Sequence, residues 1–172
     1  YIGSYRAAEN TFGMITQVIG RAGRGKAAGR ALIQTVTPKN RVIELAARQD
    51  YDTFYEEELP LRRLRGCPPF FDLLTVTFYG RVEEQVWQAA QRFRAALEAQ
   101  LRAPCYREQR VELLGPAPAQ VARVNYNYRC RLTLSCRNTR ELRLLLSHLM
   151  REFAKDKYNR GVGVFTDVNS NE

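Results

Sequence analysis

Hydrophobic periodicity constrains the second half of this chain more than any other feature of the sequence. Apolar and polar side chains alternate from Leu73 to Tyr79 and, more clearly, from Tyr128 to Arg137. A repeat of two residues is typical of a β-strand with one buried face. Apolar residues recur at steps of three and four from Val82 to Leu101 and from Leu142 to Phe153, which is the spacing of an amphipathic helix. The pattern predicts two strands and two helices that share a core.

Two shorter apolar runs complete this pattern. Val111–Leu114 and Val162–Phe165 each have the composition of a short strand, and Asn138 or Thr139 is placed to cap the second helix. The resulting order, β-α-β-β-α-β, is that of a ferredoxin-like split βαβ unit. We therefore expect an α+β domain whose two helices cover one face of the sheet and leave the other face for a partner or for solvent.

A sharp break at Gly66–Phe70 separates this domain from the residues before it. The two prolines of this stretch lack backbone donors and disfavour helix. We place a domain boundary there, which divides the chain into segments 1–65 and 66–172.

The first segment is expected to be an incomplete α/β unit. A helix from Tyr5 to Gln17 leads into a stretch rich in glycine and arginine, and Ala31–Val36 has the β-branched, apolar character of a short buried strand. Two helices are then expected at Asn40–Gln49 and Asp50–Arg65. Because one strand makes no sheet, the segment needs further strands from elsewhere.

Composition favours an anionic partner. Among 172 residues, 27 Lys and Arg stand against 18 Asp and Glu, a net charge of +9 in which arginine dominates. Arginine forks match phosphate oxygens and stack on bases, so nucleic acid is a better expectation than a membrane surface. A basic domain without such a partner is the alternative. No run is long enough to span a membrane, and a chain opening at Tyr1 without a signal peptide is expected to be cut from a longer one.

The cysteines do not predict a metal site. Cys67, Cys105, Cys130 and Cys136 form no CxxC pair, and His148 is the single histidine. Reduced thiols in a cytoplasmic protein are the expected state.

The stretch Gln17–Arg24 carries the clearest chemical motif. It reads QxxGRxxR, with Arg21 and Arg24 three residues apart, so both guanidiniums reach one cluster of phosphate oxygens. Arginines placed in this way stabilise the charge that develops during γ-phosphoryl transfer. Gly20 and Gly23 let the backbone come close to the ligand. A solvated basic loop is the structural alternative.

This motif resembles motif VI of superfamily 2 helicases, in the variant of the PriA family of replication-restart DNA helicases. Other parts of the chain resemble the same family: Arg6, Ala7 and Glu9, Ile33–Thr35 with Pro38, Asp50–Tyr51, Phe54–Tyr55, Glu58, Arg62, Pro68–Phe70, Gly115–Ala119, Arg123 and Tyr128–Arg129. The similarity spans most of the chain. It lapses at the end, where the family often has D-V-D-P and this chain has Asp167–Ser170.

The resemblance implies an ATP-dependent DNA helicase that recognises stalled or branched forks and initiates primosome assembly. In such an enzyme Arg21 and Arg24 would face the γ-phosphate of ATP, and Gln17 would link nucleotide state to the lobe interface. Segment 1–65 would then be the α/β end of a RecA-like lobe. This sequence has no GxxxxGK[ST] loop and no acidic pair for magnesium, and it lacks the family's zinc-binding insertion, so this portion alone is expected to be inactive.

The second domain is expected to bind DNA through Arg123, Arg129 and Arg131. The competing interpretation is that these arginines lie on an ordinary solvated face of the sheet. The segment Gly115–Pro118 is either a rigid turn or part of the binding surface. The resemblance implies branched and single-stranded DNA, single-stranded-DNA-binding protein and other primosome proteins as partners.

A stand-alone module of the RRM type is the alternative function, because RRM domains share the same order of elements. An RRM places stacking rings on the open face of its central strands. This sequence places Arg129, Arg131 and Thr133 there, which favours the helicase interpretation.

Overall fold

The computed structural model describes residues 4–22, 30–106 and 109–170, and these divide into two compact units. The boundary falls between Arg65 and Gly66. A search of the described residues found no helix with the length and apolar character needed to cross a bilayer.

The first unit consists of three helices, α1 (Ala7–Ala22), α2 (Arg41–Ala47) and α3 (Tyr51–Leu64). Their small core contains Phe12 of α1, stacked on Phe54 of α3 with ring centroids 4.6 Å apart. Polar caps set the starts of the last two helices, because Asn40 Oδ1 accepts the Val42 N–H at 3.0 Å and Asp50 Oδ1 accepts the Thr53 N–H at 3.1 Å. All three helices predicted for the first segment are confirmed, and the first continues beyond the predicted Gln17 to Ala22.

The strand predicted at Ala31–Val36 is wrong. The segment has no regular structure, and the side chains of Leu32 and Val36 are both 98% exposed. A strand needs a neighbour that satisfies its backbone N–H and C=O groups, and the described part of this unit offers only helices. The α/β character expected for residues 1–65 is therefore absent from the part of them that the structure describes.

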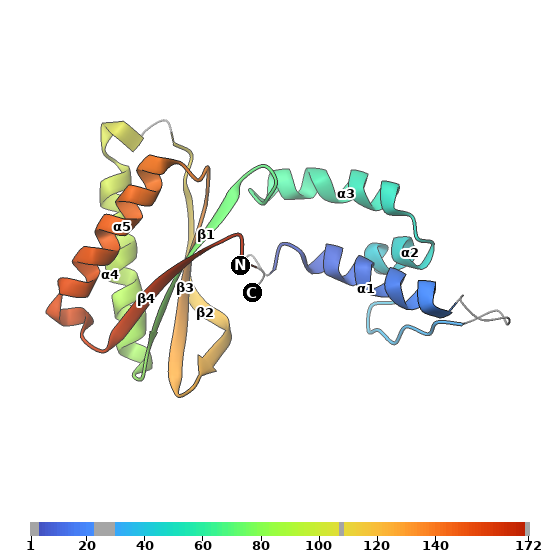
Figure 1. Ribbon diagram of the computed structural model, residues 1–172, viewed down its shortest axis with the longest axis horizontal. Helices are drawn as coiled ribbons and strands as arrows, with labels where there is room; N and C mark the ends of the chain where they lie inside the picture. Colours follow the sequence, from blue (N-terminus) through green and yellow to red (C-terminus); the bar gives the residue numbers. More distant parts are fainter. Residues whose placement is uncertain (1–3, 23–29, 107–108, 171–172) are drawn as a thin grey trace. The chain divides into compact units, whose positions relative to one another are not determined.

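The second unit is an α+β domain with a four-stranded antiparallel sheet. Its elements are β1 (Asp72–Gly80), α4 (Glu83–Leu101), β2 (Glu112–Val124), β3 (Asn127–Cys136), α5 (Arg140–Lys155) and β4 (Val162–Val168), with short 3-10 turns at Pro104–Tyr106 and Lys157–Asn159. Strand order across the sheet is β2-β3-β1-β4. Helices α4 and α5 lie together on one side of the sheet (Figure 1).

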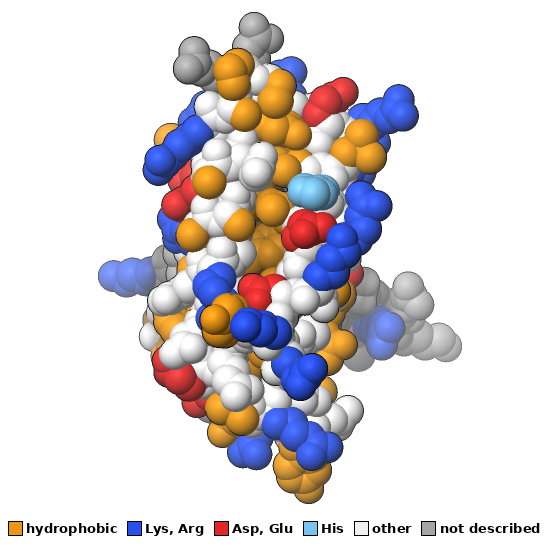
Figure 2. Space-filling model, turned by 90° about the vertical axis from the view of Figure 1, so that its left-hand side faces the viewer, with side chains coloured by type: hydrophobic (Ala, Val, Ile, Leu, Met, Phe, Trp, Pro, Cys, Tyr) orange, Lys and Arg blue, Asp and Glu red, His pale blue; other side chains and the backbone are white. Residues whose placement is uncertain are grey.

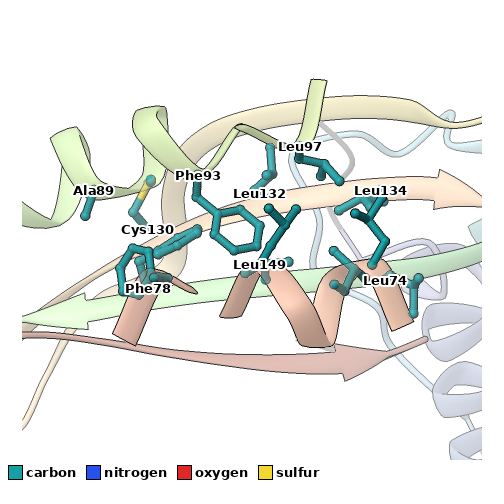
Figure 3. Close-up of a cluster of buried hydrophobic side chains, with 14 of the residues drawn as sticks. Leu74, Phe78, Ala89, Phe93, Leu97, Cys130, Leu132, Leu134 and Leu149 are labelled. Atoms are coloured by element: carbon teal, nitrogen blue, oxygen red, sulfur yellow. The ribbon is translucent and has the colours of Figure 1, made fainter. Parts of the chain in front are cut away.

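The core lies between the sheet and these helices, as the periodicity predicts. Figure 3 shows Phe93 and Leu97 of α4 and Leu149 of α5 pointing toward Leu132 and Leu134 of β3. Leu97, Leu132 and Leu134 are completely buried. Burying each such side chain contributes about 1.5–3 kcal/mol, so the apolar stripes of the sequence are the main source of the unit's stability.

Strand β2 is much longer than the predicted Val111–Leu114. Gly115–Ala119 lies within it and is not a turn. Two shifts in the register with β3 flank Ala117 and Pro118. Proline is tolerated on an edge strand such as β2, where N–H groups that face solvent make no ladder bond. Gly115 has φ of 99°, and a Cβ there would lie 2.7 Å from the Arg131 carbonyl oxygen.

Asn169 joins the end of β4 to the start of β1 through side-chain hydrogen bonds. This residue follows β4 with φ of 51°, and its Oδ1 accepts the Leu73 N–H at 2.8 Å. Its Nδ2 donates to Asp72 Oδ1 at 3.0 Å, while Asp72 Oδ2 accepts the Asn138 N–H at 3.1 Å. A carboxylate in place of this amide would face Asp72 directly, so the asparagine suits the residue opposite it.

Candidate nucleic-acid interface

The helicase-like motif lies on the last turns of α1. Gln17, Gly20 and Arg21 are all exposed, and Gln17 and Arg21 are four residues apart and share one face of the helix. Gly23 and Arg24 lie outside the described residues. The C-terminal end of a helix carries partial negative charge, so attraction of phosphate at this position depends on the arginine side chains and not on the helix dipole.

The second candidate surface is the face of the sheet that carries no helix. Along β1 and β3, residues that face the helices alternate with residues that lie on this open face. Strand pairing sets Tyr79 opposite Arg129 and Thr77 opposite Arg131. From the other side, β4 sets Phe165 opposite Thr77. Side chains of directly paired residues lie on the same face of an antiparallel sheet. Three strands thus contribute rings and guanidinium groups to this face, and Thr77 between them is completely buried.

Two rings and one arginine on this face are in contact with one another. The ring centroids of Tyr79 and Phe165 are 6.0 Å apart, and the Arg129 guanidinium carbon lies 5.9 Å from the Phe165 ring centroid. The Tyr79 ring covers Gly163 so closely that a Cβ there would lie 2.2 Å from the ring. Tyr79 is 40% exposed. The glycine thus allows the ring to lie flat on β4 while its outer side remains accessible.

The structure brings Arg129 and Arg131 together but places Arg123 elsewhere. Arg123 is paired directly with Tyr128, and Tyr128 alternates with Arg129 along β3, so its side chain points to the opposite face. The guanidinium carbon of Arg123 lies 5.0 Å from the Tyr128 ring centroid. The three arginines predicted as a single DNA surface therefore form two surfaces.

Charge is distributed unevenly over this unit. From Leu113 to Thr139 the chain contains four arginines and no acidic residue. The helix-covered side instead mixes Lys and Arg with Asp and Glu (Figure 2). Two acidic residues do belong to the open face, since Glu112 is paired with Ser135 and Asp167 with Thr75. Both lie toward the end of the sheet away from Tyr79 and Arg129.

Buried thiols offer no reactive chemistry here. Burial raises the pKa of Cys130 to about 11 and that of Cys136 to about 12, so both remain protonated at neutral pH. In the part of the chain that the structure describes, no three His, Cys, Asp or Glu side chains are grouped in a way that could hold a metal ion.

Sequence reasoning missed Phe165 and Gly163 on this surface. Tyr79 was visible as the polar-side residue of an alternating strand, but its neighbours Gly163 and Phe165 are more than 80 positions away. The available signal was the alternation along the last strand, in which Gly163 and Phe165 alternate with Val162 and Val164, which pack against the core. Alternation along one strand does not show which other strand lies beside it.

Comparison with known proteins gives a consistent result. A family described as "Primosomal protein N C-terminal domain" matches residues 63–170. The chain is 32% identical over 169 residues, 98% of its length, to "Replication restart protein PriA" of Bacillus subtilis (strain 168). It is 38% identical to the Synechocystis protein of that name over 74% of its length, and 43% identical to the Chlamydia pneumoniae protein over 59%.

These relatives are much longer than the chain, which covers 20% of the Bacillus protein, 15% of the Synechocystis protein and 14% of the Chlamydia protein. The family match spans well over half of the chain and coincides with the second compact unit. The chain therefore belongs to the PriA family of replication restart proteins, and residues 63–170 are the C-terminal domain of that family.

Proposed function

We propose that this chain is the C-terminal portion of an ATP-dependent DNA helicase that recognises stalled or branched replication forks and initiates primosome assembly in the bacterial cytoplasm. The family match and the relatives named for replication restart support this proposal. The chain spans only a fifth of the Bacillus relative. The helicase activity then belongs to the longer protein, and this portion is inactive alone.

We assign the contribution of this chain to ATP hydrolysis by the helicase to Gln17, Arg21 and Arg24. The exposed, shared face of Gln17 and Arg21 suits a role at an interface with another part of the enzyme. Gly20 has nothing within 4 Å of the position a Cβ would take, which leaves room for close approach there, and Gly23 is proposed for the same role from the motif alone. ATP and magnesium would be held mainly by residues outside this chain, and zinc by the family's cysteine-rich insertion.

The test of this assignment is Arg21→Ala in the full-length protein. ATP turnover falls by about a thousandfold or more, since arginines that contact the transferring phosphoryl group have effects of that size. DNA affinity stays within about twofold of wild type. Arg151→Ala, an exposed arginine on α5, serves as the control and keeps full turnover. Normal turnover in Arg21→Ala contradicts the assignment.

The second unit is proposed to bind DNA through the open sheet face. The observation that carries this is the convergence of Arg129, Arg131, Tyr79 and Phe165 on a surface without covering helices. Guanidinium groups neutralise phosphates and the rings provide faces on which bases stack. Branched and single-stranded DNA are the proposed ligands, with single-stranded-DNA-binding protein and other primosome proteins as partners of the whole enzyme.

The alternative, a stand-alone RRM-like module, is not favoured. Strand β3 presents arginines and a threonine on the open face where an RRM has rings. The matched relatives are replication restart proteins.

Salt-dependent binding to a single-stranded oligonucleotide tests the DNA surface. Each phosphate contact contributes about 0.7 to the slope of log K against log salt for single strands, so Arg129→Gln with Arg131→Gln lowers the slope by about 1.4. Arg140→Gln with Arg151→Gln removes the same charge from exposed positions on α5 and leaves the slope nearly unchanged. Equal losses in the two double variants would show that net charge alone is responsible.

A further inference from the structure

The turn between β2 and β3 has a residue that its backbone does not favour. Val124 pairs with Asn127, and the two residues between them, Asn125 and Tyr126, have φ of 48° and 64°. This is the pattern of a type I′ hairpin turn, in which glycine is the preferred second residue. Positive φ is costly for a bulky side chain. A tyrosine at this position therefore opposes the local preference of the chain.

The side chain of Tyr126 is 80% exposed, so its ring contributes little to the core. Strain kept at an exposed position points to a role outside folding.

The ring is part of a small stack with Arg123 at its centre. The Arg123 guanidinium carbon lies 5.9 Å from the Tyr126 ring centroid and 5.0 Å from that of Tyr128. Arg123 has no carboxylate partner among the described side chains, and no acidic residue occurs in the hairpin from Leu113 to Thr139. The stack holds the guanidinium in place without neutralising it.

We infer that the tip of the β2–β3 hairpin, formed by Arg123, Tyr126 and Tyr128, is a stacking site for an unpaired base of single-stranded DNA. An exposed ring binds the face of any base, and an unneutralised arginine beside it attracts the adjoining phosphate. Bases inside a duplex are already stacked on each other, so the ring selects unpaired nucleotides.

This inference rests on the proposed DNA binding by the second unit, but it concerns a separate surface. Arg123 and Tyr128 point to the face opposite Arg129 and Arg131. The hairpin tip would therefore engage a nucleotide that the open sheet face does not hold.

Tyr126→Gly is the informative variant because its effects on folding and on binding have opposite signs. Glycine suits the second position of this turn, so the urea midpoint of the 172-residue chain stays the same or rises. Tyr126→Phe is the matched control, since it keeps the ring and removes only the hydroxyl.

Binding is measured on three probes: a 12-nucleotide oligothymidylate, the same backbone with abasic sites, and a 12-base-pair duplex. Tyr126→Gly weakens oligothymidylate binding by about fivefold to a hundredfold, the range found for loss of one base-aromatic stack. Its affinity for the abasic strand and for the duplex changes by less than about twofold. Tyr126→Phe binds all three probes as the wild type does.

The outcomes separate this inference from the proposed function. If the wild-type chain binds none of the probes, the proposed DNA binding is wrong and the inference falls with it. If Arg129→Gln with Arg131→Gln weakens binding while Tyr126→Gly binds oligothymidylate normally, only the stacking site is wrong. A Tyr126→Gly variant that loses affinity equally for the strand with bases and the abasic strand also overturns it, because the contact would then be to the backbone.

Discussion

Replacing Asn169 by aspartate tests how the end of β4 is attached to the start of β1. The amide makes two side-chain bonds there, accepting the Leu73 N–H at 2.8 Å and donating to Asp72 Oδ1 at 3.0 Å. Asn169→Asp keeps the first and replaces the second by a contact between two carboxylates. Both residues are partly buried, so solvent only partly screens the repulsion.

The size of the effect follows from this geometry. Two unit charges 3 Å apart repel by about 5 kcal/mol at an effective dielectric constant of about 20, and rotation of the new side chain relieves much of this. Loss of a hydrogen bond to a charged group adds about 1.5–3 kcal/mol. We expect Asn169→Asp to lower the free energy of unfolding by about 2–4 kcal/mol at pH 7.

The destabilisation depends on pH with a definite sign. Repulsion between two carboxylates raises the pKa of one carboxyl in the folded variant above its unfolded value. Folding of the variant is therefore least favourable above that pKa and recovers as the pH falls through it, because a protonated carboxyl donates the lost hydrogen bond. Asn169→Gly, which removes the side chain altogether, serves as the control and lacks this recovery.

Urea unfolding followed by tryptophan fluorescence measures the effect. Trp87 is the only tryptophan and packs against the core of the second unit, so its emission reports that unit. A second change completes the test: Asp72→Asn with Asn169→Asp exchanges donor and acceptor and restores most of the lost stability. Equal destabilisation at pH 7 and pH 4, or no rescue in the double variant, would refute this account.

Three further predictions follow from the structure. Gly163→Ala forces the Tyr79 ring off β4, because the new Cβ would lie too close to the ring. We expect the free energy of unfolding to fall by about 1–3 kcal/mol, measured as a lower urea midpoint, and binding of oligothymidylate to weaken as well. Bonds from Thr53 lower the pKa of Asp50, so the first unit loses stability as the pH falls below about 4, and circular dichroism of Asp50→Asn shows a smaller loss. Iodoacetamide at pH 8 modifies Cys105, which is exposed, and spares the three buried cysteines; mass spectrometry showing more than one adduct on the folded chain contradicts that burial.

Local patterns were enough to predict most elements of the second unit. The alternation along β1 and β3 and the apolar stripes of α4 and α5 each depend on residues within one element, and each is confirmed. Strand β2 was predicted too short because Gly115–Ala119 contains two prolines. Proline is incompatible with a central strand but not with an edge, and sequence alone does not show which strand is the edge.

The strand wrongly predicted at Ala31–Val36 has the opposite cause. Its composition is that of a strand, but strand formation requires a partner, and the described residues around it are helical or irregular. Composition reports what a segment prefers, whereas pairing depends on what lies beside it.

The sequence by itself determined the family, the basic character of the chain and the order of strands and helices in its second half. Tertiary structure decided which side chains meet: Tyr79 with Gly163 and Phe165, and Asp72 with Asn169. It also separated Arg123 from Arg129 and Arg131. The physical reason is that periodicity is a property of neighbouring residues, whereas strand order and register arise only when distant segments pair.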